Sequence, residues 1–316
     1  MIDKIKEMTV FQILKDSVIA FGKSDSMSYA AGTAFYTIFS MPALLIIVLN
    51  IGSTFYQKGT VKEELLNQVE QLSGPESAET LDSIIYNASL ETEGFVPKMV
   101  AIGVILFSAT TVFVSLQTSI NHIWHIKPMP EKGLLKFVIN RLLSFSLVAS
   151  IGFVLLVSLI IDALIVIFFN YVELLIKGVS IYLATLTSFV FTQGLMVVIF
   201  GLMYKILPDA KVRWRSVWLG AIVTMVLFAL GKYLIGFYLG NSDVGSAYGT
   251  AGSLVIVLVW VYYSVIIFLF GAQITYFIAE NIGKGIQPIK QAIKVKIVEL
   301  EEVDEPEDDK IEQEKT

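Results

Sequence analysis

Cysteine is absent from this chain of 316 residues, and histidine occurs only twice, at His122 and His125. The missing thiols exclude disulfide bonds and thiolate metal sites. Two histidines without an acidic cluster beside them do not build a hydrolytic metal centre, and no HExxH or GxxxxGK[ST] string occurs. We therefore expect no enzymatic activity, no metal and no cofactor, and we interpret the histidines as interfacial anchors beside Trp124.

Charge is also scarce, because only 16% of the residues are charged while 55% are hydrophobic. Soluble domains are about a quarter charged. An apolar helix of about 20 residues crosses the ~30 Å hydrocarbon core of a membrane, and several uncharged stretches reach that length. The expected fold class is all-α, a polytopic membrane protein with a transmembrane domain at 26–280. Its six transmembrane helices are predicted at 28–55, 98–120, 142–169, 179–204, 216–239 and 246–279.

Three other segments flank or interrupt these spans. Residues 1–25 place apolar side chains at steps of three or four, which predicts an amphipathic helix that lies on the membrane surface or packs against the bundle. The outer loop 57–97 carries two apolar helical faces separated by Ser73, Gly74 and Pro75, so we expect two short helices there. Residues 281–316 turn polar and then acidic, which predicts a largely disordered cytoplasmic tail.

Basic residues set the predicted orientation. The N-terminal segment, the linkers that follow the second and fourth spans, and the start of the tail each carry four of them. The opposite side carries Lys58, Lys62, Lys98 and Lys177. By the positive-inside rule, both termini are expected in the cytoplasm and the acidic loop outside a cytoplasmic (inner) membrane.

Polar residues within the spans are the candidate functional groups. Asp162 and Lys232 are predicted near the outer leaflet, where they either snorkel and pair with each other or form a charged vestibule. Pro42 predicts a kink near Ser40, or alternatively a broken helix that binds a ligand. Gly249 and Gly252 beside Tyr248 indicate either close helix packing or an unwound segment.

Hydroxyl side chains recur at helical spacing on the first, second and fourth spans. Such stripes point away from lipid, and they either hydrogen-bond between helices or line a water-filled path. The stripes consist of Thr33, Tyr36, Thr37 and Ser40, then Ser108, Thr111, Ser115 and Thr118, then Thr185, Ser188 and Thr192. The candidate pathway residues are Tyr36, Ser40, Pro42, Ser115, Asp162, Lys232, Tyr248, Gly249 and Gly252.

Four stretches carry a family resemblance: SYAAGTAFYTIFSMPALLIIV (28–48), FSATTVFVSLQTSINHIWHI (107–126), YKILPDAKVRWRSVWLGAIVT (204–224) and SAYGTAGSLVIVLVWVYYSVIIFLFGAQITY (246–276). Together they resemble the hallmark segments of the YihY/virulence factor BrkB family of bacterial inner-membrane proteins, over about residues 8–280. The resemblance implies a six-helix membrane protein from a group that once carried the label ribonuclease BN. Its members have been linked to serum resistance, envelope lipid transport and ion export.

Three hypotheses for function follow. The first is a transporter or lipid-handling protein whose partners are membrane lipids and a small solute, an ion or a lipid headgroup. The alternative is a scaffold of the cell envelope, or a virulence or stress-resistance factor, that transports nothing. The third is a ribonuclease, which the small polar surface and the acidic outer loop disfavour, so we expect no nucleic acid partner.

Overall fold

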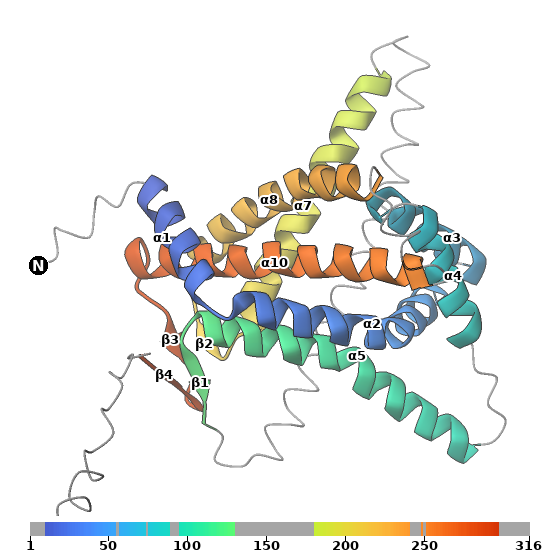
Figure 1. Cartoon of the computed structure of the whole chain (residues 1–316), viewed down its shortest axis with the longest axis horizontal. Coiled ribbons are helices and arrows are strands. Elements are labelled where there is room, and N and C mark those ends of the chain that lie inside the picture. Colours follow the sequence, from blue (N-terminus) through green and yellow to red (C-terminus); the bar gives the residue numbers. More distant parts are fainter. Residues whose placement is uncertain are drawn as a thin grey trace, which may run out of the picture.

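The computed structural model describes residues 10–54, 57–73, 75–88, 95–129, 180–240, 248 and 251–296. Its long helices are α2 (Ser26–Gly52), α5 (Phe95–Ile123), α7 (Ser180–Ile206), α8 (Trp214–Gly240) and α10 (Gly252–Asn281). Helix α10 runs through the middle of the molecule and packs between α2 and α8 (Figure 1). Helix α5 packs on α2, and α7 packs on α8. The most extensive contacts therefore join the helices in the order α5, α2, α10, α8, α7, and both α5 and α7 also contact α10.

Four of these helices are long and apolar enough to cross a membrane, over Ser26–Asn50, Phe189–Ile206, Trp214–Tyr238 and Leu254–Asn281. They coincide with the first, fourth, fifth and sixth predicted spans. The second predicted span is helical as part of α5. The third, at 142–169, lies outside the described residues, so the total of six spans stays a prediction.

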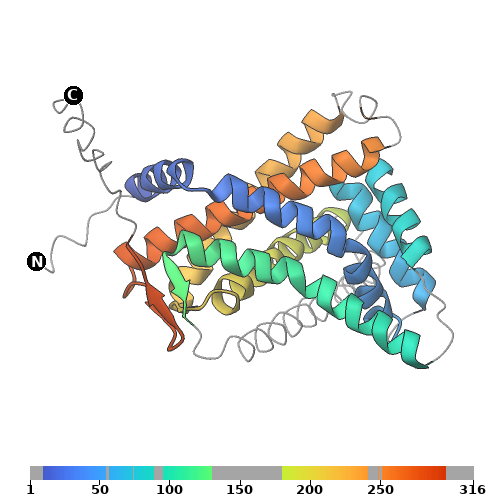
Figure 2. The same cartoon turned by 60° about the horizontal axis from the view of Figure 1, so that its bottom comes forward.

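Pro42 lies inside a continuous α2. Proline removes one backbone hydrogen bond and crowds the preceding turn, which bends a helix without ending it when neighbouring helices support it. Figure 2 shows α2 changing direction in its second half. The structure therefore agrees with a bent helix and not with the alternative of a broken one.

Helix α1 (Val10–Lys23) packs across one end of α10. Ile13 and Phe21 are buried there, and the Phe21 and Phe270 rings meet edge to face with centroids 5.3 Å apart. A second apolar face of α1 stays uncovered, with Phe11 72% and Val18 58% exposed. Packing on the bundle and contact with a membrane surface are thus compatible, because they use different faces of one helix.

At the other end of the bundle lie α3 (Lys58–Ser73) and α4 (Pro75–Ala88), which we call the cap (Figure 1). Two helices were predicted for this segment, and α3 ends at Ser73 while α4 begins at Pro75, as the predicted break requires. Its location outside the membrane stays a prediction. Val61, Leu81 and Ile85 of the cap form a small core with Leu45 and Leu49 of α2. This core holds the cap against the end of α2.

Four short strands form what we call the collar, at the end of the bundle opposite the cap. They are β1 (Ile126–Pro128), β2 (Ala210–Lys211), β3 (Gln287–Pro288) and β4 (Ala292–Lys294). β1 pairs antiparallel with β4, and β2 pairs antiparallel with β3.

The collar adds detail to two predictions. Its short strands accompany a mostly helical fold of the predicted all-α class, and two of them, β3 and β4, lie within 281–316, the segment predicted as a largely disordered tail. Residues 287–294 instead fold back onto the bundle as β3 and β4. Strands of two or three residues are too short to show an alternating pattern, so the sequence gives no signal for them.

Candidate functional site

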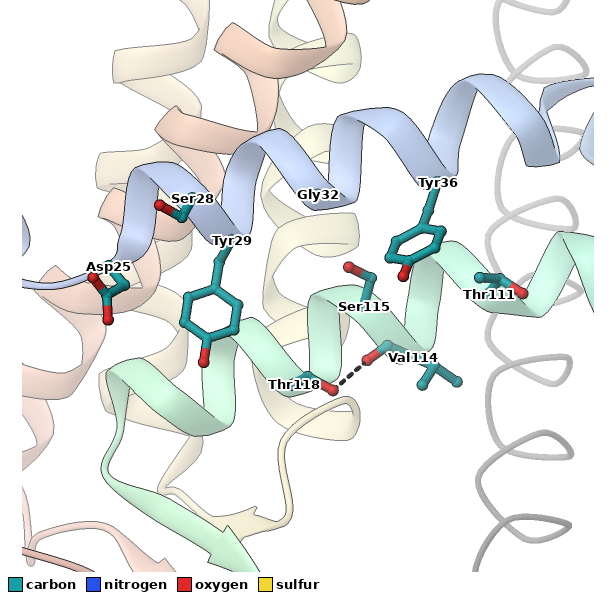
Figure 3. Close-up of a pocket in the computed structure, with 9 residues that line it drawn as sticks. All are labelled: Asp25, Ser28, Tyr29, Gly32, Tyr36, Thr111, Val114, Ser115 and Thr118. Atoms are coloured by element: carbon teal, nitrogen blue, oxygen red, sulfur yellow. Dashed lines mark hydrogen bonds between the residues drawn. The ribbon is translucent and has the colours of Figure 1, made fainter.

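A cavity of about 600 Å³ lies between α2 and α5 (Figure 3). We call it the α2–α5 groove. Its described lining residues are Asp25, Ser28, Tyr29, Gly32 and Tyr36 on one side and Thr111, Val114, Ser115 and Thr118 on the other. Tyr36 lies eleven residues after Asp25, which is roughly 16 Å of helix at 1.5 Å per residue and about half of a ~30 Å membrane core. The groove therefore extends from the collar end of α2 towards the middle of the bundle.

Gly32 creates the space between the two helices. It follows Tyr29 by about one turn and precedes Tyr36 by about one turn, so the three residues share one face of α2. A Cβ atom at Gly32 would meet no atom within 4 Å. Figure 3 shows both tyrosine side chains pointing from α2 towards α5, one on either side of Gly32.

Hydroxyl groups line the α5 wall of the groove. Thr118 Oγ1 donates a hydrogen bond to Val114 O at 2.9 Å (Figure 3). Ser115 Oγ lies 2.8 Å from Thr33 Oγ1, which ties α5 to α2. Thr33 Oγ1 is also 2.9 Å from Tyr29 O, an acceptor that takes the Thr33 proton. Ser115 is then the donor to Thr33, and the lone pairs of Ser115 and Thr118 provide acceptors for a ligand.

A histidine contacts one of the lining residues near the collar end of the groove. The rings of Tyr29 and His122 have centroids 4.6 Å apart, and Tyr29 Oη lies 3.4 Å from His122 Nδ1. His122, which was predicted to be an interfacial anchor, thus contacts the lining residue Tyr29. Among the described lining residues, Asp25 alone is an acidic or basic side chain, so the groove carries one negative charge at its collar end.

The groove contains two of the predicted pathway residues, Tyr36 and Ser115. Ser40 and Pro42 lie further along α2, and Ser40 is only 2% exposed. Three other predicted residues occupy the cap half of the molecule and do not line the groove: Lys232, Tyr248 and Gly252. Asp162 and Gly249 lie outside the described residues.

Sequence reasoning missed Asp25, Ser28, Tyr29 and Gly32. The spacing of the two tyrosines around a glycine is visible in the sequence and is the signal that would have found this face of α2. The four residues were overlooked because the predicted stripe on this helix began at Thr33.

A second polar cluster joins the collar to the bundle and lies away from the groove. Asn121 Nδ2 donates to Asp209 Oδ2 at 3.1 Å, and the backbone N–H of Asp209 donates to Asn121 Oδ1 at 2.8 Å. Trp124 is fully buried, and its Nε1–H donates to Ala272 O at 2.9 Å. These bonds attach the end of α5 to α10 and to the loop that precedes α8.

The collar also contains the second histidine. Glu280 Oε1 accepts hydrogen bonds from Lys294 Nζ at 2.6 Å and from the backbone N–H of Ile286 at 2.9 Å. His125 stands beside this pair with a φ of 56°. Burial is the main cause that lowers the pKa of His125 below its ordinary value, and the neighbouring His122 and Lys294 lower it further. Within the described ranges, no group of three or more histidine, aspartate or glutamate side chains is placed to hold a metal ion.

A family model described as virulence factor BrkB matches residues 18–294. The chain belongs to this family. The matched region begins within α1, contains the whole lining of the α2–α5 groove and ends at Lys294, the last residue of β4. The collar is therefore part of the BrkB family region, in contrast to the predicted boundary at 280.

The curated relatives of this BrkB family chain are named UPF0761 membrane proteins. The one from Alteromonas mediterranea is 24% identical, over 82% of this chain and 85% of the relative. Those from Verminephrobacter eiseniae and Xanthomonas campestris pv. campestris are 24% and 27% identical, over 79% and 78% of this chain but only 58% and 55% of the relatives. The chain thus spans little more than half the length of these two relatives. No solved structure matches it.

Proposed function

We propose that this BrkB family protein is a transporter or lipid-handling protein of the cytoplasmic membrane, and that its pathway begins in the α2–α5 groove. One observation carries the proposal: a cavity lined by hydroxyl groups and one carboxylate lies between two long apolar helices. Polar side chains at membrane depth are costly unless they face a partner or a water-filled space. The proposal includes no catalytic step and no cofactor.

The distribution of charge supports an orientation with the collar in the cytoplasm. Described basic residues at the collar end include Lys127, Lys211, Arg213, Lys284 and Lys290. The cap instead carries acidic residues such as Glu63, Glu64, Glu70 and Glu79. By the positive-inside rule the groove then opens to the cytoplasm, both termini are cytoplasmic and the cap lies outside.

Helix α1 fits this placement as an interfacial helix. Its inner face packs on α10, its exposed apolar face with Phe11 and Val18 suits the acyl chains, and Lys15 and Lys23 suit the headgroup region. The groove begins at Asp25, immediately after α1, so a substrate would enter next to the membrane surface.

One observation favours the alternative of a scaffold that transports nothing. The hydroxyl of Thr33 bonds Ser115 on the neighbouring helix, and the hydroxyl of Thr118 bonds its own backbone. Such contacts hold membrane helices together without any passage. Only a flux measurement separates the two functions.

The test is to fill the groove. Phenylalanine at Gly32 would enter the open space between Tyr29 and Tyr36, because no atom lies within 4 Å of the position of its Cβ. The purified full chain is reconstituted into liposomes, and movement of fluorescent phosphatidylethanolamine, sodium ions and protons is recorded. We expect wild-type protein to move at least one of these probes, and Gly32→Phe to slow that movement about tenfold or more, which corresponds to a barrier higher by about 1.4 kcal/mol.

The matched control is Gly194→Phe on α7, where an added Cβ likewise meets no atom within 4 Å. This variant should retain wild-type movement. Absence of movement of all three probes with wild-type protein would favour the scaffold. Equal rates for Gly32→Phe and wild type would remove the groove from the pathway.

A further inference from the structure

We infer that the α2–α5 groove binds a lipophilic organic cation, meaning a molecule with an apolar body and one positive charge of the ammonium type. The inference deepens the proposed function, because it names the class of ligand that the transport site takes. It rests on three properties of the described lining: its charge, its two aromatic rings and the direction of its hydrogen bonds.

The charge of the lining selects the sign of the ligand. Asp25 is exposed at the collar end of the groove, and neither lysine nor arginine belongs to the described lining. Among the described residues, Asp25 forms no ion pair. A bound cation would therefore meet a carboxylate that has no counter-ion among the described residues, whereas a bound anion would be repelled by it.

The two tyrosines supply a surface that suits the same charge. Tyr29 and Tyr36 point into the groove from one face of α2, with the space left by Gly32 between them (Figure 3). The face of an aromatic ring attracts cations, and cages of aromatic rings bind quaternary ammonium groups in proteins. Tyr29 lies about one helical turn from Asp25, and Tyr36 lies deeper in the groove. Tyr36 is 44% exposed, so its ring is accessible to a ligand.

Two hydroxyl groups of the α5 wall, those of Ser115 and Thr118, face the ligand as acceptors. The Thr118 proton is donated to Val114 O, and the Ser115 proton is directed to Thr33. What these side chains present to the groove is lone pairs, which suit a cation or its N–H groups and offer nothing to an anion. Val114 and the edges of the rings contribute apolar surface, and about 600 Å³ is within the range of sites for small molecules.

The experiment uses two probes of the same shape and opposite charge, tetraphenylphosphonium and tetraphenylborate. The full chain is placed in nanodiscs of phosphatidylglycerol, and binding is measured by equilibrium dialysis against empty discs. We expect saturable binding of the phosphonium and none of the borate. Asp25→Asn should weaken binding of the cation about tenfold through the lost charge. Tyr36→Leu should weaken it about fivefold, and Tyr36→Phe, which keeps the ring face, should leave it near the wild-type value.

The control variant is Asp16→Asn, which removes a carboxylate of α1 that does not line the groove. It should bind like wild type, and thermal melting of each variant confirms that it is folded. Adding phosphatidylethanolamine to the discs identifies the source of the charge. Displacement of the phosphonium assigns the site to an amine-bearing lipid, and unchanged binding assigns it to a free solute.

Equal binding of the two ions, no saturable binding of the phosphonium, or binding that is unaffected by both Asp25→Asn and Tyr36→Leu would each overturn the inference. These outcomes are independent of flux. Selective phosphonium binding without any probe movement would leave the ligand class intact and contradict transport. Probe movement that is blocked by Gly32→Phe without phosphonium binding would retain the transport proposal and contradict the ligand class.

Discussion

The α8–α10 contact and the α2–α5 groove use the same kinds of residue with opposite results. Each combines glycine on one helix with a hydroxyl side chain on the neighbouring helix. Between α8 and α10, a Cβ at Gly220 would lie 2.8 Å from Thr275 Cβ, and one at Gly271 would lie 2.9 Å from Thr224 Cβ. Between α2 and α5, a Cβ at Gly32 would meet nothing within 4 Å. Glycine closes the first contact and opens the second.

The difference arises from what the neighbouring side chains fill. Tyr204 of α7 is fully buried beside the α8–α10 contact, where its Oη lies 2.9 Å from Thr224 Oγ1 and 2.7 Å from Phe268 O. Its ring also stacks on Phe268 at a centroid distance of 5.0 Å. Among the residues that the structure describes, no such side chain fills the groove, where Tyr29 and Tyr36 lie on either side of Gly32. Helices α7, α8 and α10 thus form a closely packed unit, whereas α2 and α5 leave an open space between them.

The largest expected effect comes from replacing one glycine in each of the two contacts by alanine, which adds a single methyl group. Gly271→Ala should cost about 3 kcal/mol of unfolding free energy, because the new Cβ overlaps Thr224 and Tyr204 and the helices must separate. Gly32→Ala should be neutral or stabilise by up to about 1 kcal/mol, because the methyl enters open space and alanine favours helix. Both changes in unfolding free energy are measured by unfolding the purified protein in mixed micelles with a rising fraction of denaturing detergent.

The two alanine variants are controls for each other, because each adds the same methyl group to a glycine within a helix. Similar stabilities would contradict the distinction between the closed contact and the open groove. A large loss for Gly32→Ala in particular would show that the groove is filled in the membrane-embedded protein.

A smaller effect is expected where the collar joins α5. Asn121→Leu removes both hydrogen bonds to Asp209 and leaves the buried backbone N–H of Asp209 without its acceptor. We expect a loss of about 2 kcal/mol of unfolding free energy, which is typical for an unsatisfied buried donor. Asn50→Leu is the matched control, because Asn50 is exposed and its side-chain amide donates to Ile46 O of its own helix. Equal losses for both variants would show that the Asn121–Asp209 pair adds nothing to the attachment.

Much of the helical architecture is predictable from this sequence because long apolar runs and strong breaks dominate it. The absence of charge between Ser26 and Gln57 predicts α2, and the Ser73–Gly74–Pro75 break separates the cap helices. The hydroxyl stripe predicts that Tyr36 and Ser115 face a common space.

The remaining features depend on contacts between distant segments. The collar strands are too short to have a periodic pattern, and their pairing joins residues more than 70 positions apart, such as Ala210 with Pro288. A helical glycine permits either close packing or an open space, depending on the side chains of the neighbouring helix. The sequence around Gly32 and Gly271 therefore does not show which of them has which surroundings. The charged site predicted from Lys232 and Asp162 stays a prediction, since Asp162 is outside the described residues.

The smallest expected effect is a pH dependence of the melting temperature, which we expect to arise in the collar and not in the groove. His125 has a lowered pKa, so the folded protein favours the neutral ring, whereas the unfolded chain binds the proton near pH 6.5. The unfolded state therefore binds more protons just below that pH, and stability that is present above about pH 6.5 is lost as the pH falls through the lower pKa of the folded state. Melting temperatures measured between about pH 7.5 and 5 should fall on acidification.

The variant His125→Asn isolates this contribution, because asparagine tolerates the positive φ of 56° at this position and does not titrate. It should reduce the fall of the melting temperature on acidification, while Lys127→Gln on the adjacent strand should leave the fall unchanged, because this variant retains the His125 ring. Asp25→Asn in the groove should also leave it unchanged, because Asp25 is exposed and lies outside the collar contacts. If His125→Asn melts with the same pH dependence as wild type, the acid-sensitive contact lies elsewhere, and the collar is no more sensitive to protons than the groove.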